Sequence, residues 1–262
     1  MSPKLNEISV SVNLKAYQLA YQFALEQDTL AKSKQVYLNT LAIYAVRDFL
    51  EEFSFETDLE AGDSWNAAIR CFHDVADLLI PNIGKIECRP ILPGETTVSL
   101  PPELEDRIAY VVVKFKEELN QVQLLGYYPT IEPESSQELQ ITELEPIENL
   151  IDYLFRLELA NDYMNSDDEV AVKVKEKFDT RSIPEIVAQL ERIYRTCDES
   201  DRRHVASDFL TGLTGAVREI SDKSQVRSFR AKSDDFDEDN EEDLTDLAED
   251  LLDKLSEIWG RD

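Results

Sequence analysis

The clearest opportunity for nucleophilic chemistry in this chain is the short stretch that holds Cys71, His73 and Asp74. A thiol nucleophile needs a base within hydrogen-bond reach. In a helix, residues two positions apart point to different faces, so Cys71 and His73 would not form such a pair. The chain also lacks the G-x-S-x-G, H-E-x-x-H and P-loop patterns. This inventory favours a non-catalytic protein over an enzyme.

A group of carboxylates before Trp65 has the chemistry of a cation site. Asp58, Glu60 and Asp63 could supply oxygen ligands for Ca²⁺ or Mg²⁺. The stronger interpretation is that Asp63 or Ser64 caps a helix that begins at Trp65, while the other acids are solvated. We therefore predict no metal site here.

A second group of acids comes close to the spacing of an EF-hand loop. Asp235, Asp237 and Asp239 match the first three ligands, but Asn240 replaces the loop glycine and Asp246 stands where the bidentate Glu is expected. These departures favour weak, nonspecific cation binding over a calcium switch. No cofactor is predicted.

The C-terminal segment is strongly acidic, with twelve Asp or Glu residues and no Lys or Arg between Ser233 and Asp253. A block of like charge repels itself, so a partner that supplies positive charge would favour its ordering. Residues 233–243 carry only Phe236 as an apolar group and are expected to be disordered.

From Leu244 onward the apolar residues recur at helical spacing and predict an amphipathic helix. We predict that its apolar face binds a protein partner. The predicted binding residues are Leu244, Leu247, Leu251, Leu255, Ile258 and Trp259. The alternative is a helix that packs on its own domain.

The other predicted apolar faces lie before Ile220, so truncation after Arg230 is expected to leave the thermal midpoint nearly unchanged. Docking of the tail is the competing possibility, because basic residues precede the acids and could pair with them. They are Lys223, Arg227, Arg230 and Lys232.

Composition narrows the choice of partner and compartment. The net charge of -28 disfavours unaided binding to nucleic acid or to anionic membranes, and leaves a protein partner, possibly a basic one. The N-terminus lacks a secretory signal and no apolar run approaches the roughly 20 residues that span a bilayer, so a cytoplasmic protein is expected. Three cysteines without C-x-x-C spacing indicate neither a disulfide framework nor a zinc site.

Residue periodicity predicts an α+β fold, in which an N-terminal helix pair accompanies a small antiparallel sheet of four or five strands. The sheet is followed by a mainly helical C-terminal half and the acidic tail. The expected elements are a strand near 8–12, helices around 16–23, 38–49 and 65–79, and strands between 83 and 131. The expected divisions are an α+β domain at 1–131, a linker at 132–145, a helical region at 146–222 and the tail with its amphipathic helix at 223–262.

Five blocks of residues resemble, in order, a cyanobacterial family of uncharacterised proteins that is defined as a domain of unknown function. The blocks are KQVYLNTLAIYAV (34–46), ETDLEAGDSWN (56–66), GKIECRPILPG (84–94), DRIAYVVV (106–113) and LLGY (124–127). The resemblance covers about residues 8–131 and is weaker to about residue 159. It implies a cyanobacterial source and an intracellular protein, and it carries over no catalytic residue.

The third of these blocks reads as a half-exposed strand. Lys85, Glu87 and Arg89 alternate with Ile86 and Cys88, so the polar side chains share one face. A solvated polar face is expected, with partner binding as the alternative. The whole chain is thus predicted to be a non-catalytic interaction or regulatory protein, and the alternative is an enzyme with an unrecognised active site in the family domain.

Overall fold

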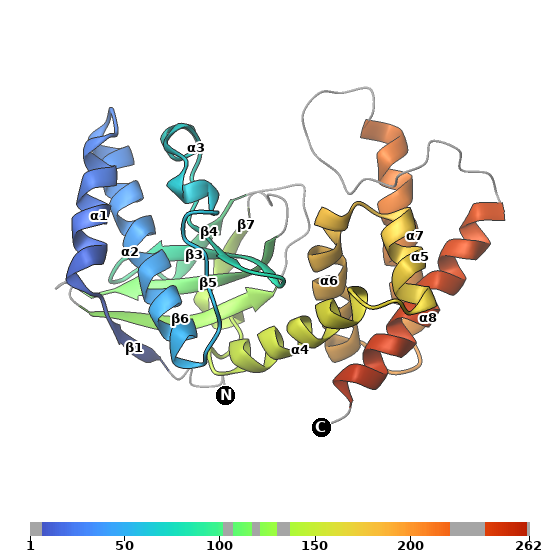
Figure 1. Cartoon of the computed structure of the whole chain (residues 1–262). Coiled ribbons are helices and arrows are strands. Elements are labelled where there is room, and N and C mark those ends of the chain that lie inside the picture. Colours follow the sequence, from blue (N-terminus) through green and yellow to red (C-terminus); the bar gives the residue numbers. More distant parts are fainter. Residues whose placement is uncertain (1–6, 102–106, 117–120, 130–136, 221–238, 261–262) are drawn as a thin grey trace. The chain divides into compact units, whose positions relative to one another are not determined.

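The computed structural model describes residues 7–101, 107–116, 121–129, 137–220 and 239–260 (Figure 1). The chain forms two compact units, residues 1–153 and 154–262. The division between them lies within a helix, α4 (Asn149–Met164), and so comes later in the chain than the linker expected at 132–145. Of the stretch expected to be disordered, residues 233–238 lie outside the described residues.

The first unit begins with strand β1 (Ile8–Ser11), followed by helices α1 (Leu14–Leu25) and α2 (Leu30–Glu52). Asn13 and Thr29 cap the two helices, because their side chains accept hydrogen bonds from the first-turn backbone amides. The helices lie side by side, and α2 contacts the sheet (Figure 1). The predicted order of one strand and then a helix pair is confirmed.

The main sheet has five strands in the order β1-β6-β5-β3-β2. Its further strands are β2 (Asp77–Ile80), β3 (Gly84–Ile91), β5 (Arg107–Phe115) and β6 (Gln121–Pro129). The prediction of a purely antiparallel sheet is wrong for one pair, because β3 and β5 run parallel. They can do so because the chain between them does not form a direct hairpin but passes through another strand, β4 (Thr97–Leu100).

Strand β4 pairs with β7 (Gln137–Gln140) in a second, two-stranded sheet. The small sheet contributes Val98, Leu100 and Leu139 to an apolar cluster with Tyr110 and Val112 of β5. Strand β7 lies in the segment expected to be a linker without strands. The buried apolar residue of β7 is Leu139. One such residue is too few to produce an alternation of apolar and polar residues that would predict a strand.

The helix expected at 65–79 is the least accurate part of the predicted fold. The chain instead forms a 3₁₀ turn (Asp63–Trp65), the short helix α3 (Ala67–Phe72) and then β2. The cap is Asn66, which accepts hydrogen bonds from the amides of Ala68 and Ile69, and not Asp63 or Ser64 as predicted. Pairing of β2 with β3 buries Leu78 and Ile80, and this tertiary contact outweighs helical periodicity.

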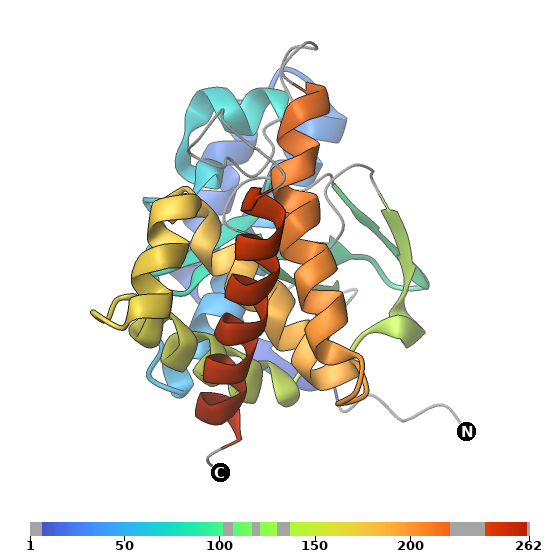
Figure 2. The same cartoon turned by 90° about the vertical axis from the view of Figure 1, so that its right-hand side faces the viewer.

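The second unit is helical, as predicted. Its elements after α4 are α5 (Glu169–Lys177), α6 (Ile183–Thr196), α7 (Arg202–Ile220) and α8 (Asp239–Trp259). Helix α8 runs beside α7, with α5 on its other side (Figure 2). No described helix is both long and apolar enough to cross a membrane.

Candidate functional site

Helix α8 carries all six residues predicted to bind a partner, and five of them are buried inside the second unit. The buried residues are Leu244, Leu247, Leu251, Leu255 and Trp259, while Ile258 is half-buried. Helices α5, α6 and α7 contact α8. The expectation that the tail contributes little burial is therefore wrong, since its apolar residues are part of a core. Partner binding by this face stays a prediction.

The end of α8 is fixed by its tryptophan. The Trp259 indole N–H donates a hydrogen bond to the carbonyl oxygen of Arg156, at 2.9 Å. The Trp259 ring also packs on Tyr194 of α6, with ring centroids 5.3 Å apart. A buried indole that satisfies its donor is a specific anchor. Helix α8 is thus held at its C-terminal end as well as along its apolar stripe.

The opposite face of α8 presents carboxylates to solvent. Asp246, Asp250, Asp253 and Glu257 are all exposed, and their spacing of four, three and four residues places them on one side of the helix. We call these four residues the acidic row. Asp253 forms an ion pair with Arg203 of α7, at 2.5 Å. The acidic row was not among the sites predicted from the sequence, although the spacing of its residues is the signal that could have found it.

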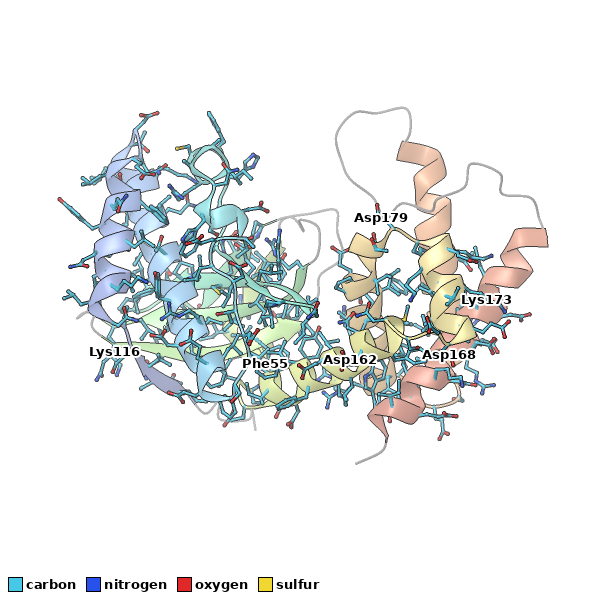
Figure 3. All side chains as sticks on the ribbon, in the orientation of Figure 1. Phe55, Lys116, Asp162, Asp168, Lys173 and Asp179 are labelled. Carbon is cyan, nitrogen blue, oxygen red and sulfur yellow. The ribbon has the colours of Figure 1, made fainter. Side chains whose placement is uncertain are left out.

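The local potential around the acidic row is negative. The Tyr163 hydroxyl donates a hydrogen bond to Asp168, at 2.7 Å, and Figure 3 labels Asp168 before α5. Burial raises the pKa of Tyr163, and the hydrogen bond and charge of Asp168 raise it further, as do the charges of Asp250 and Glu257. Lys254 is a nearby cation in addition to Arg203, with its ammonium 4.0 Å from the Asp168 carboxylate.

The first unit holds a second concentration of charge, but this one is buried. Glu87 of β3 is fully buried and forms ion pairs with Arg107 at 2.5 Å and with Arg89 at 3.2 Å. Its carboxylate also accepts a hydrogen bond from the Ala76 amide, at 2.7 Å. The expected solvated polar face of this strand is therefore wrong for Glu87 and Arg89, which are buried, while Lys85 is half-buried.

The buried network extends from Arg89 to Asp74, which lies between α3 and β2. The Arg89 guanidinium contacts the Asp74 carboxylate at 2.6 Å, and the Asn39 amide donates to the same carboxylate at 3.0 Å. Burial alone would raise the pKa of Asp74, but its hydrogen bond to Arg89 and the Arg89 charge outweigh burial, and the pKa is lowered. The opposite holds for Glu87, since burial raises its pKa despite the two arginines. The network ties α2, β3 and β5 together.

The residues with possible nucleophilic chemistry are not brought together. Cys71 and His73 are both exposed, and the backbone at His73 is extended, so it lies outside α3. Cys88 is buried, and burial raises the pKa of its thiol well above the ordinary value. A buried neutral thiol is a poor nucleophile.

The acids before Trp65 are engaged in local structure. Asp58 accepts hydrogen bonds from the amides of Glu60 and Ala61, and Asp63 lies 3.4 Å from the Lys85 ammonium. Among the described residues, no group of three or more His, Cys, Asp or Glu residues has an arrangement that could hold a metal ion. Asp235 and Asp237 of the EF-hand-like stretch lie outside the described residues.

One family model matches the chain, over residues 10–200, and its description is "Protein of unknown function (DUF1822)". The match extends beyond residues 8–131, where the resemblance was seen, and covers both sides of the expected linker and helices α4 to α6. Helix α8 lies outside it. The comparison with curated proteins and the comparison with solved structures gave no match.

Proposed function

The chain belongs to the DUF1822 family of proteins of unknown function, and we propose that it is a non-catalytic interaction module whose second unit binds a basic protein partner through the acidic row of α8. The observation that carries this proposal is the division of α8 into two faces. Its apolar stripe is used within the unit, and its carboxylates point outward.

The acidic row has a physical cost that a partner would remove. Like charges at i, i+3 and i, i+4 spacing destabilise a helix, and here Asp246, Asp250, Asp253 and Glu257 all follow that spacing. Only Arg203 is seen to pair with the row, through Asp253, among the described residues. A basic surface would neutralise the row and would be steered toward it by the negative potential.

The apolar residues of α8 would reach a partner only if the helix left α5, α6 and α7, so we assign the contact to the carboxylates instead. A cytoplasmic location and a cyanobacterial source fit an intracellular interaction protein, and both stay predictions. An enzyme with a site in the first unit stays the alternative.

The proposal is tested by affinity capture from the source cells followed by surface-based binding kinetics on the captured protein. The test variant is D246N/D250N/D253N/E257Q, which removes the acidic row. The matched control is E7Q/D28N/E52Q/E60Q, which removes four exposed carboxylates from the first unit. Both variants change the net charge by the same amount, so they separate a local contact from a general charge effect.

We expect the test variant to associate about tenfold more slowly at low salt, and the difference to shrink at high salt, because exposed charges are screened beyond roughly 10 Å at 0.1 M ionic strength. The control should keep most of the association rate. Equal loss in both variants would mean that overall charge, and not α8, governs binding. A captured partner without a basic surface would also contradict the proposal.

A further inference from the structure

Helix α1 carries large apolar side chains on its exposed side as well as on its buried side. Its inner side buries Ala16, Ala20 and Phe23. Its outer side exposes Leu14, Tyr21 and Leu25, at 72%, 61% and 68%. Side chains on the outer side of α1 extend away from α2 (Figure 3). In a single copy of the chain, the described residues leave this face uncovered.

The outer face has the spacing of a helix-pairing seam. Four of the exposed residues of α1 are Leu14, Gln18, Tyr21 and Leu25, separated by four, three and four positions. This is the alternation of core positions in a coiled coil, where each position inserts between residues of the facing helix. We call these four residues the α1 seam. Leu30, the first residue of α2, is exposed as well.

Charge indicates what can cover the α1 seam. The chain has 55 Asp and Glu residues among 262, yet α1 contains none, and its only charged residue is Lys15. Two copies with a net charge of -28 each would repel one another over most of their surface. The neutral face of α1 is a place where they can approach without opposing like charges.

The α1 seam is also complementary to itself. When two copies of α1 lie antiparallel around a two-fold axis between Leu19 and Ala20, Leu14 of each copy faces Leu25 of the other. Gln18 then faces Tyr21 of the second copy, where an amide and a phenol can form a hydrogen bond. An isologous interface requires such a match, since the same patch must serve both subunits.

We propose that the α1 seam is a homodimer interface, in which a second copy of this chain covers the outer face of α1 in the antiparallel register. A helix of 12 residues is only about 18 Å long. The interface therefore falls below the roughly 1,200 Å² at which standard stable interfaces begin, in the range of weak and transient association. We expect a reversible dimer, and its formation is independent of the acidic row on α8.

The experiment is sedimentation velocity of the full chain from about 1 µM to about 100 µM, a range that brackets a micromolar dissociation constant. The wild type should shift from monomer to dimer with concentration. Q18E/Y21E places two pairs of like charges across the two-fold axis, so its dissociation constant should rise at least about tenfold. Q18K/Y21K should behave in the same way when it is alone.

Mixing the two variants tests the register itself. Each Glu of one copy then faces a Lys of the other, so an equimolar mixture should form dimers again. The matched control is L159E/N165E, which adds two negative charges at exposed positions of the second unit and should leave dimerisation unchanged. Circular dichroism of every variant checks that the fold is intact.

Three results would overturn the proposal. One is a wild type that stays monomeric at the highest concentration, which would also be the result if a different protein or a lipid surface covers α1. Another is a dimer that Q18E/Y21E does not weaken. The third is a mixture of the two variants that fails to restore the dimer.

Discussion

Replacing Leu251 by Ala distinguishes a packed helix α8 from one that is free to bind. Leu251 is fully buried. Burial of each methylene group stabilises by about 0.8 kcal/mol, and a Leu→Ala change in a core also leaves a cavity, so measured losses run from about 2 to 5 kcal/mol. We expect L251A to lower the free energy of unfolding of the second unit by about 3 kcal/mol.

The matched control is the same chemical change at an exposed position. Leu159 of α4 is 51% exposed and belongs to the same unit. Its replacement by Ala should change the free energy of unfolding by less than about 1 kcal/mol, as is usual for surface positions. The contrast between L251A and L159A therefore measures burial and not the loss of a leucine as such.

The chain provides its own probe for this measurement. It has two tryptophans, Trp65 in the first unit and Trp259 in the second. In a W65F background, urea unfolding followed by fluorescence reports only on Trp259, which lies on α8. Linear extrapolation then gives the free energy of unfolding, and an unchanged slope shows that the same surface is exposed.

One result would refute this reasoning. If L251A destabilises the second unit no more than L159A does, the apolar stripe of α8 is not part of a core. The six apolar residues predicted from the sequence would then be available to a partner. In that case α8 would present its apolar face to solvent as well as the acidic row.

Two further predictions concern the buried charges of the first unit. Glu87→Gln leaves Arg107 buried without its counter-charge, so we expect a loss of about 3 to 5 kcal/mol in the free energy of unfolding. The control is Glu51→Gln, which breaks a surface ion pair with Arg47 and should cost less than about 1 kcal/mol. The pKa of Asp74 is lowered in the folded state, so its stabilising effect is fully present above the ordinary value of 3.8. The effect is lost as the pH falls from that value through the lowered pKa, so the destabilisation that Asp74→Asn causes at neutral pH should shrink over this range in urea titrations. Equal losses for E87Q and E51Q, or a pH-independent effect of D74N, would contradict these two predictions.

The parts of the fold that the sequence predicts correctly are those whose apolar periodicity agrees with their final contacts. Helix α1 buries one regular face, and so does α6 in the second unit. Helix α2 is covered on all sides from Leu38 to Val46, but its apolar residues still recur at helical spacing. The stretch that forms β2 fails this test, because Val75, Ala76, Leu78 and Ile80 suit either a helix or a strand. Pairing with β3 decides between them, and local periodicity does not contain that information.

The environment of a charged side chain is harder still to predict. Lys85, Glu87 and Arg89 alternate with apolar residues as they would on a solvated face, yet Glu87 and Arg89 are buried. Their burial depends on Arg107, which lies on a strand that runs parallel to β3 and reaches it only in the folded sheet. A sequence pattern shows which residues share a face, but it does not show what covers that face.

The two faces of α8 make folding and recognition separable in one experiment. L251A should weaken the second unit without changing the charge that a partner meets, so association with the native fraction should keep its rate and its salt dependence. Neutralising the acidic row should have the opposite effect, because removal of like charges relieves repulsion along the helix while it slows association. A recognition helix that used its apolar stripe would show both losses together in L251A, since the same side chain would then serve the core and the partner.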